Sequence, residues 1–364
     1  MVKLGIIGMG YTGQQQALAA APVAGLRPVA ATDAEPRALA DLPEGMRPVP
    51  TWQDLVADSE VDAVTVCLPH DAHEEVVLAA LAAGKHVLIE KPLAIDLAGA
   101  VRIAAAAAAS DRVVMVEMTH RFYPPMRAAR ALVETGRLGT IYAVEDRIVQ
   151  YVRPGLLPGW MLDRRQSGGG VGLTNGVHML DRMAWLCGQP LTFVAGRAGW
   201  SHGLGNIEDT AAMLLTLANG APANLLASWS VVQPPPAGEG ASATAAVDGP
   251  ALRGSMDDEL TVYGTGGTLR VWSWDGWAFE PADGPPEEHA GFPDDMERAA
   301  RVRVAMTAAL EEFAGAIEQG RRASPDAAQI LEVHRLLDRF YADAGTGRCA
   351  TSAVNPTQSA EEMA

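Results

Sequence analysis

The chain has 364 residues, a length that suggests two domains. Hydrophobic residues make up 48% and charged residues 20%, which excludes a mainly disordered protein, because disordered chains are poor in apolar residues. The formal net charge of −16 repels phosphate groups and argues against nucleic acids and membranes as partners, and no apolar run is long enough to predict a membrane-spanning helix.

The first predicted elements are a strand, a glycine turn and a helix. An apolar strand at Val2–Ile7 leads into GMGYTG at Gly8–Gly13, and an alanine-rich helix then runs to about Ala21. A second strand, Pro28–Thr32, ends at Asp33, 20 residues after the last of these glycines. This order and spacing are typical of a dinucleotide-binding unit. The alternative is a tight glycine turn that binds nothing.

Each residue of this motif has a physical role in such a unit. Gly8 permits the turn, Gly10 lets the backbone approach a pyrophosphate, and Gly13 lets the helix pack on the strand. The start of the helix offers free N–H groups to the phosphates. Asp33 would accept hydrogen bonds from the adenosine ribose and repel a 2′-phosphate, so we expect NAD as the cofactor. Arg37 lies close by and keeps NADP open as an alternative.

Strands and helices continue to alternate, with strands predicted at 61–68, 86–89 and 113–116 and helices at 73–83 and 97–109. This alternation predicts a doubly wound parallel sheet, in which ligands bind at the carboxyl ends of the strands. Lys91 follows one such strand directly and is expected beside the nicotinamide. The residues expected to contact the dinucleotide are Gly8, Met9, Gly10, Tyr11, Thr12, Gly13, Asp33, Leu68, Pro69, His70, His73, Glu90 and Lys91.

The pattern changes after about residue 120, so we place a Rossmann domain at 1–120 and a second domain at 121–350. The second domain has predicted helices at 124–134 and 174–186 and strands at 141–152, 193–199, 210–217, 223–232, 259–263 and 268–274. Consecutive strands favour a large, mostly antiparallel sheet. The stretch 233–258 is predicted to be a flexible excursion. Helices are predicted at about 294–319 and 326–344 and are expected to pack back onto the first domain, and 351–364 is predicted to be a frayed tail.

Several motifs together resemble the Gfo/Idh/MocA oxidoreductases, the family of glucose–fructose oxidoreductase and inositol dehydrogenase. They are GIIGMGYTG near the start, AGKHVLIEKPLA at 83–94, GRLG at 136–139, GGGVGLTNGVHMLD at 168–181 and VYGTGGTLRV at 262–271. The resemblance implies a Rossmann domain, and a second α/β domain whose open sheet forms homodimers or homotetramers. It also implies NAD(P)-dependent hydride transfer at a secondary alcohol of a sugar, inositol or related cyclic polyol.

Carried over to this chain, the family's EKP lysine falls on Lys91 and its motif histidine on His178. Many members have an aspartate four residues before that histidine, where this chain has Thr174, which cannot carry a proton as a carboxylate can. We expect burial and the charge of NAD⁺ to lower the pKa of Lys91 so that it can act as a base, and His178 to bond the same substrate oxygen. The expected substrate contacts are Thr174, Asn175, Arg121, Trp160 and Arg165.

Each assignment has a plainer alternative. Lys91 would otherwise form a structural ion pair with Glu90, and His178 would be a buried core histidine. Asp181 is either a partner of His178 or an ordinary capping acid, and His120 is expected at a loop or the surface. No metal site is expected.

Two other functions remain open alongside the dehydrogenase. One is a non-catalytic NAD(H)-binding regulator, and the other is an NAD-dependent glycoside hydrolase that regenerates its cofactor in each turnover. The three cysteines, Cys67, Cys187 and Cys349, are odd in number and widely spaced, which suits a reducing cytoplasm.

Overall fold

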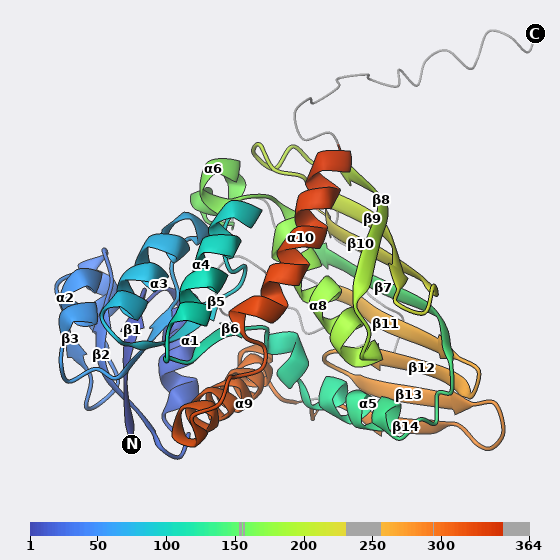
Figure 1. The fold of residues 1–364 in the computed structure, drawn as a ribbon, viewed down its shortest axis with the longest axis horizontal. Helices are drawn as coiled ribbons and strands as arrows, with labels where there is room; N and C mark the ends of the chain where they lie inside the picture. Colours follow the sequence, from blue (N-terminus) through green and yellow to red (C-terminus); the bar gives the residue numbers. More distant parts are fainter. Residues whose placement is uncertain (153–154, 156, 231–255, 294, 345–364) are drawn as a thin grey trace, which may run out of the picture.

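The computed structural model describes residues 1–152, 155, 157–230, 256–293 and 295–344. Two sheets lie side by side, one in each half of the molecule (Figure 1). The first half is coloured blue to cyan, and the second sheet is coloured green to orange. Helix α10, at Ala327–Asp343, runs between the two halves.

The first sheet has six parallel strands in the order β3-β2-β1-β4-β5-β6. This is the strand order of a dinucleotide-binding Rossmann domain, and it reverses direction between β1 and β4, where such sheets bind their ligands. The strands are β1 (Val2–Ile7), β2 (Leu26–Thr32), β3 (Arg47–Pro48), β4 (Ala63–Val66), β5 (His86–Glu90) and β6 (Val114–Glu117). The helices are α1 (Tyr11–Ala20), α2 (Trp52–Ala57), α3 (His73–Ala82) and α4 (Leu97–Ala109).

The second sheet has eight strands in the order β14-β13-β12-β11-β7-β10-β9-β8. All neighbours are antiparallel except β7 and β10, which confirms the predicted mostly antiparallel sheet. The strands are β7 (Ile141–Tyr151), β8 (Leu191–Gly199), β9 (Thr210–Leu217), β10 (Pro222–Ser230), β11 (Met256–Gly264), β12 (Gly267–Trp272), β13 (Gly276–Pro281) and β14 (Glu287–Ala290). Helices α5 (Pro124–Glu134) and α8 (Gly176–Cys187) pack on this sheet, and the short helices α6 (Arg164–Ser167) and α7 (Val171–Thr174) precede α8.

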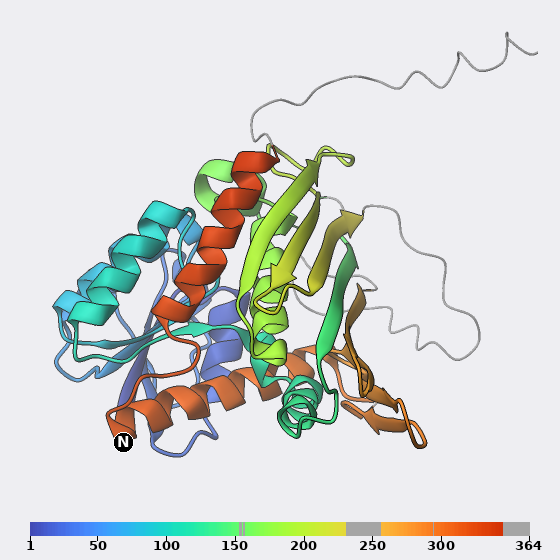
Figure 2. The same ribbon diagram turned by 45° about the vertical axis from the view of Figure 1, so that its right-hand side comes forward.

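The last two helices return to the first domain. Helix α9, at Arg298–Gln319, runs from the second sheet to α1 along the lower edge of the molecule (Figure 2). There the Arg303 guanidinium donates to Gln15 Oε1 at 2.8 Å, and the Thr307 hydroxyl donates to the Ala19 carbonyl at 3.1 Å. Helix α10 packs against both α4 and β8, so it joins the two domains.

Some elements differ from the sequence prediction. Residues 256–258, predicted as part of a flexible excursion, belong to β11; the rest of that stretch up to 255, and the predicted tail 351–364, lie outside the described residues. The prediction also lacked α2, β3, β13 and β14. The last of these is the polar edge strand EEHA, which carries none of the apolar alternation by which strands are recognised.

Candidate functional site

The glycine turn after β1 leaves open space at Gly10, where the pyrophosphate of a dinucleotide would pass. Gly8 has φ +92°, and a Cβ there would lie 2.3 Å from the Cys67 carbonyl oxygen. A Cβ on Gly13 would lie 1.9 Å from the Gly8 carbonyl oxygen, so the helix can approach the turn only without a side chain. A Cβ on Gly10, in contrast, would meet nothing within 4 Å. The two outer glycines therefore shape the turn, and the middle one faces room for a ligand at the start of α1.

Asp33 is held beside this turn by backbone donors. Its Oδ2 accepts from the Met9 N–H at 2.6 Å, and its Oδ1 accepts from the Glu35 N–H at 2.8 Å. Each carboxylate oxygen has a second lone pair for a further donor. The arrangement fits an adenosine ribose at the end of β2, with the phosphates over Gly10 and the first turn of α1.

The two predicted loops beyond β4 and β5 are joined by His73. Its ring is fully buried, with Nδ1 2.9 Å from the Pro92 carbonyl oxygen and Nε2 3.0 Å from that of Leu68. Burial lowers the pKa of His73 to about 4, so the ring is neutral. Each ring nitrogen faces a carbonyl oxygen, and the single N–H of the neutral ring donates to one of the two. The side chain thus lies between the loops that carry Leu68, Pro69 and Lys91.

His70, in the same loop, connects the first domain to the second. Its Nδ1 lies 2.7 Å from the Ser167 carbonyl oxygen, and its ring meets Trp160 edge to face with centroids 4.7 Å apart. Trp160 thus packs on a loop predicted to contact the cofactor.

Lys91 reaches from the end of β5 to the second domain. Its Nζ lies 3.4 Å from the backbone carbonyl oxygen of Thr174, at the end of α7. Burial lowers the pKa of Lys91, and the nearby Glu90 carboxylate opposes this shift. The amine therefore lies where the loop after β5 meets the end of α7, just before α8.

Behind Lys91 lies an acidic pair that the sequence reading did not anticipate. Glu90 and Glu117 are neighbours on β5 and β6, and the Gln16 side-chain amide donates to Glu117. Burial raises the pKa of both carboxyls, and the negative charge of Glu90 raises that of Glu117 further. A signal was present in the sequence, because Glu117 ends an otherwise apolar strand.

His178 lies on the first turn of α8, one turn beyond Thr174. Its ring is 8% exposed, and Nδ1 is buried without a hydrogen-bond partner among the described residues. Burial lowers the pKa of His178 well below its ordinary value, and His120 and Lys91 lower it further. The neutral ring carries one N–H and one free lone pair, so it can both donate a hydrogen bond to a substrate and accept one from it. The Asn175 amide is engaged by Gln150 and by the Trp229 indole, each at 3.2 Å.

Two predicted substrate contacts lie elsewhere. Arg121 forms a buried ion pair with Asp181, with nitrogen–oxygen distances of 2.5 and 2.8 Å. A paired guanidinium of this kind is a structural support, and Asp181 thereby serves Arg121 and not His178. Arg165 is exposed and lines a separate cavity of about 260 Å³ beside Tyr341 and Leu337, to which neither Lys91 nor His178 contributes.

His120 also differs from the expectation of a loop or surface residue. It is 9% exposed and stacks on His178, with ring centroids 4.2 Å apart and an interplanar angle of 12°. His120 lies beside His178 because α8 packs on the 3-10 turn that follows β6. No local sequence pattern predicts this contact.

The fold is that of a Rossmann domain followed by a second domain with a mostly antiparallel sheet, and the two meet at Lys91 and Thr174. Residues 2–118 match the model of an oxidoreductase family described as having an NAD-binding Rossmann fold, and residues 126–270 match the C-terminal domain model of the Gfo/Idh/MocA family. The chain belongs to the Gfo/Idh/MocA oxidoreductase family, and its first domain is an NAD-binding Rossmann domain.

Curated relatives match over part of their length. The chain is 36% identical to 1,5-anhydro-D-fructose reductase of Ensifer adhaerens over 162 residues, which are 44% of this chain and 48% of that protein. It is 31% identical to inositol 2-dehydrogenase 2 of Saccharopolyspora erythraea over 228 residues, which are 60% of this chain and 64% of that protein. The matched segments thus span about half to two thirds of these relatives.

Solved structures share the whole fold at low identity. An oxidoreductase from Agrobacterium radiobacter, in complex with NAD⁺, L-tartaric acid and magnesium, has a TM-score of 0.80 at 20% identity, with 95% of this chain and 97% of that one covered. Levoglucosan dehydrogenase, in complex with NADH and levoglucosan, has a TM-score of 0.77 at 20% identity, with 94% and 97% covered. Among the described residues, no helix is long and apolar enough to cross a membrane, and no cluster of three His, Cys, Asp or Glu is placed to hold a metal.

Proposed function

We propose that this protein transfers a hydride between NAD and a secondary alcohol or ketone of a sugar, inositol or related cyclic polyol, with Lys91 and His178 handling the proton. The observation that carries this proposal is the placement of Lys91 Nζ at the carboxyl end of β5, 3.4 Å from the Thr174 carbonyl oxygen and next to the turn that bears His178. This placement supports a site at the carboxyl ends of the strands of the first sheet, where such sheets bind their ligands.

The residues that would hold the cofactor fit an NAD molecule. Gly10 and the first turn of α1 would receive the pyrophosphate, and Asp33 the adenosine ribose. The negative charge of Asp33 disfavours a 2′-phosphate, which supports NAD over NADP. When bound, the nicotinamide supplies the chemistry of accepting or returning a hydride.

Lys91 is the group suited to take the proton of the substrate hydroxyl. Burial lowers its pKa and favours the neutral amine, whose lone pair can accept a proton. The Thr174 carbonyl accepts one N–H of the amine and so orients it, where many relatives offer an aspartate carboxylate. A carbonyl has no net charge, so it holds the amine without raising its pKa as strongly as a carboxylate would.

His178 supplies the second contact to the reacting oxygen. Its lowered pKa keeps the ring neutral beside Lys91. A neutral imidazole both donates and accepts a hydrogen bond, so His178 can hold the oxygen and relay the proton on its way to the amine. In the reverse direction, protonated Lys91 returns the proton to the oxygen of the ketone as the hydride arrives.

A substrate screen tests the proposal. Sugars, inositols and keto-sugars are incubated with the protein and NAD⁺ or NADH, NADP is run in parallel, and the change in NADH absorbance is recorded. Turnover with a polyol, lost in Lys91→Met, supports the proposal. NADH binding with no turnover on any substrate would indicate a regulator, and sugar release without net NADH change would indicate a glycoside hydrolase.

We also infer that copies of the chain associate through the outer face of the second sheet as a homodimer or homotetramer. Four adjacent strands, β7 to β10, each carry an exposed apolar side chain: Tyr142, Val194, Leu214 and Leu226, which are 39–54% exposed. Adjacent exposed apolar side chains of this kind are typical of an interface. Leu214→Lys with Leu226→Lys should lower the mass measured by light scattering, and an unchanged mass would place the interface elsewhere.

A further inference from the structure

The stacked histidines His120 and His178 come from different domains. His120 lies in the 3-10 turn Thr119–Phe122 that follows β6, whereas His178 is on α8. Their rings are nearly parallel, with centroids 4.2 Å apart. The stack covers one face of the His178 ring, and this ring has no protein hydrogen bond at Nδ1 among the described residues to fix its plane. Whatever sets the position of His120 therefore also sets the plane of His178.

Arg182 sets the position and the tautomer of His120. The Arg182 Nη1 atom lies 3.3 Å from His120 Nδ1. A guanidinium has only donors, so Nδ1 must be the acceptor. A neutral His120 then carries its proton on Nε2. Burial lowers the pKa of His120 well below its ordinary value, and the charge of Arg182 lowers it further, so the ring remains neutral.

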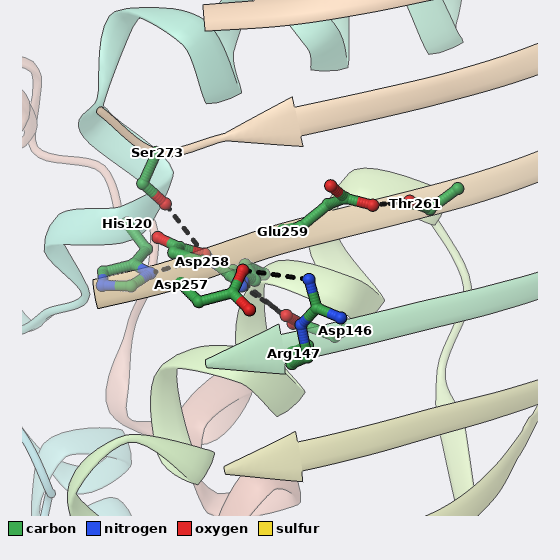
Figure 3. A network of polar contacts seen from close by, with 9 residues as sticks. His120, Asp146, Arg147, Asp257, Asp258, Glu259, Thr261 and Ser273 are labelled. Carbon is green, nitrogen blue, oxygen red and sulfur yellow. Dashed lines mark hydrogen bonds and ion pairs between the residues drawn. The ribbon is translucent and has the colours of Figure 1, made fainter. Parts of the chain in front are cut away.

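Arg182 is itself immobilised by three elements of the second domain. It is fully buried, and its Nε donates to Asp146 on β7 at 2.8 Å. Its Nη1 donates to the Ser273 hydroxyl at 3.0 Å and pairs with Asp258 on β11 at 2.7 Å. Figure 3 shows His120, Asp146, Asp258 and Ser273 converging from separate elements on this point. The guanidinium is thus a fixed donor and cannot follow a displaced imidazole.

We propose that His120 is a positioning residue: anchored by Arg182 in its Nε2–H tautomer, it serves as the flat surface that holds the His178 ring in the plane needed to bond the reacting oxygen. The catalytic part of this inference rests on the proposed function. The charged and titratable groups that surround the pair are Lys91, Tyr123, Arg182, Asp146 and Asp258. Within the part of the chain that the structure describes, none of them accepts a hydrogen bond from His178 Nδ1, so the stacked His120 ring is the contact that we expect to fix its plane.

Two variants separate the flat surface from the acceptor. His120→Phe keeps an aromatic ring against His178 but removes the acceptor for Arg182. His120→Asn keeps an acceptor near the place of Nδ1 but removes the ring. We expect His120→Phe to retain kcat within about threefold, because Arg182 keeps its other partners. We expect His120→Asn to lower kcat on the order of 10²-fold, the scale of a misplaced catalytic contact, with NADH affinity unchanged.

The control is His289→Asn. His289 also stacks on an aromatic ring, that of Trp277, with centroids 4.2 Å apart, but it is exposed on β14, the edge strand of the second sheet. This variant should leave kcat, NADH affinity and the melting temperature unchanged. Melting curves of the His120 variants, with and without NADH, establish that they are folded before their rates are compared.

Nitrogen-15 NMR of the histidine rings gives a readout that needs no substrate. The wild-type signal that disappears in His120→Phe is assigned to His120. Its nitrogen shifts should be those of an Nε2–H tautomer and should not change between about pH 5 and 8. A doubly protonated or Nδ1–H ring at His120 would overturn the inference, as would His120→Asn with the wild-type kcat. If no substrate is turned over by the wild type, the tautomer and the His178 shifts in His120→Asn still decide the structural claim, and only the proposed function fails.

Discussion

Gly10→Ala separates cofactor binding from folding. The residue has φ −63° and ψ −168°, which any amino acid can adopt, and its Cβ would meet nothing within 4 Å. Replacing glycine by alanine where the backbone allows it stabilises a protein by about 0.4–1 kcal/mol. Alanine is a poorer helix N-cap than glycine, which costs a similar amount. The two effects nearly cancel, so the melting temperature should change by only a few degrees.

The effect on NADH should be much larger. The added methyl group would occupy the space through which the pyrophosphate is expected to pass, so we predict an NADH dissociation constant raised at least tenfold, or about 1.4 kcal/mol. Fluorescence titration with NADH measures this change, and a melting curve of the unliganded protein measures folding. Wild-type NADH affinity in Gly10→Ala would refute the placement of the pyrophosphate over this residue.

Gly13→Ala is the matched contrast. Its Cβ would lie 1.9 Å from the Gly8 carbonyl oxygen, so the helix must move by more than an ångström relative to the turn. Overpacking of this kind costs about 1–3 kcal/mol. We therefore expect Gly13→Ala to lower the melting temperature without ligand, which Gly10→Ala should not do. Equal melting temperatures for the two variants would contradict the assignment of separate roles.

Five further variants test other parts of the molecule. Lys91→Met should lower kcat by about 10²–10⁴-fold while NADH still binds, and full activity would remove Lys91 from the chemistry. Asp33→Asn keeps an acceptor for the Met9 N–H and should shift the NAD-to-NADP preference ratio toward NADP. Asp181→Ala leaves the buried Arg121 without its carboxylate, so the free energy of unfolding should fall by about 3–5 kcal/mol. The double variant Arg121→Met with Asp181→Leu removes both charges and should lose less stability. The raised pKa of Glu117 means that the folded protein keeps a proton that the unfolded chain releases. The free energy of unfolding therefore falls as pH rises from the ordinary Glu value toward the raised pKa of Glu117. Urea titrations at several pH values measure this fall, and we expect it to be smaller in Glu117→Gln.

Local patterns predicted the Rossmann half because its signals lie close together in the chain. The glycine turn, the strand before it and Asp33 fall within one unit of sheet and helix, and the position of Lys91 follows from the end of one strand. Local patterns could not place Arg121, because its partner Asp181 is 60 residues away, on helix α8.

A usable signal for part of the missed network was present in β7. Its inward-facing positions are Val144, Asp146, Ile148 and Gln150, so two polar side chains occupy places where a half-buried strand normally has apolar ones. Inward polar residues need partners, and these two pair with Arg182 and Asn175, both at the start or middle of α8. The alternation of residues along β7 therefore predicts that polar side chains of a helix pack on its inward face, although it does not predict which helix.

The geometry of the proposed catalytic site depends on how the two domains are docked. Lys91 belongs to the first domain, and the carbonyl that orients it belongs to the second, as does His178. His120 crosses the same boundary to reach Arg182. The contacts that hold the domains in register come from the end of the chain: Arg303 and Thr307 of α9 on α1, and the Val116 N–H donating to the Pro325 carbonyl at 3.0 Å, just before α10. Because an error of about an ångström at a reacting group costs on the order of 10²-fold in rate, substitutions at these distant contacts should lower kcat more than they lower NADH affinity.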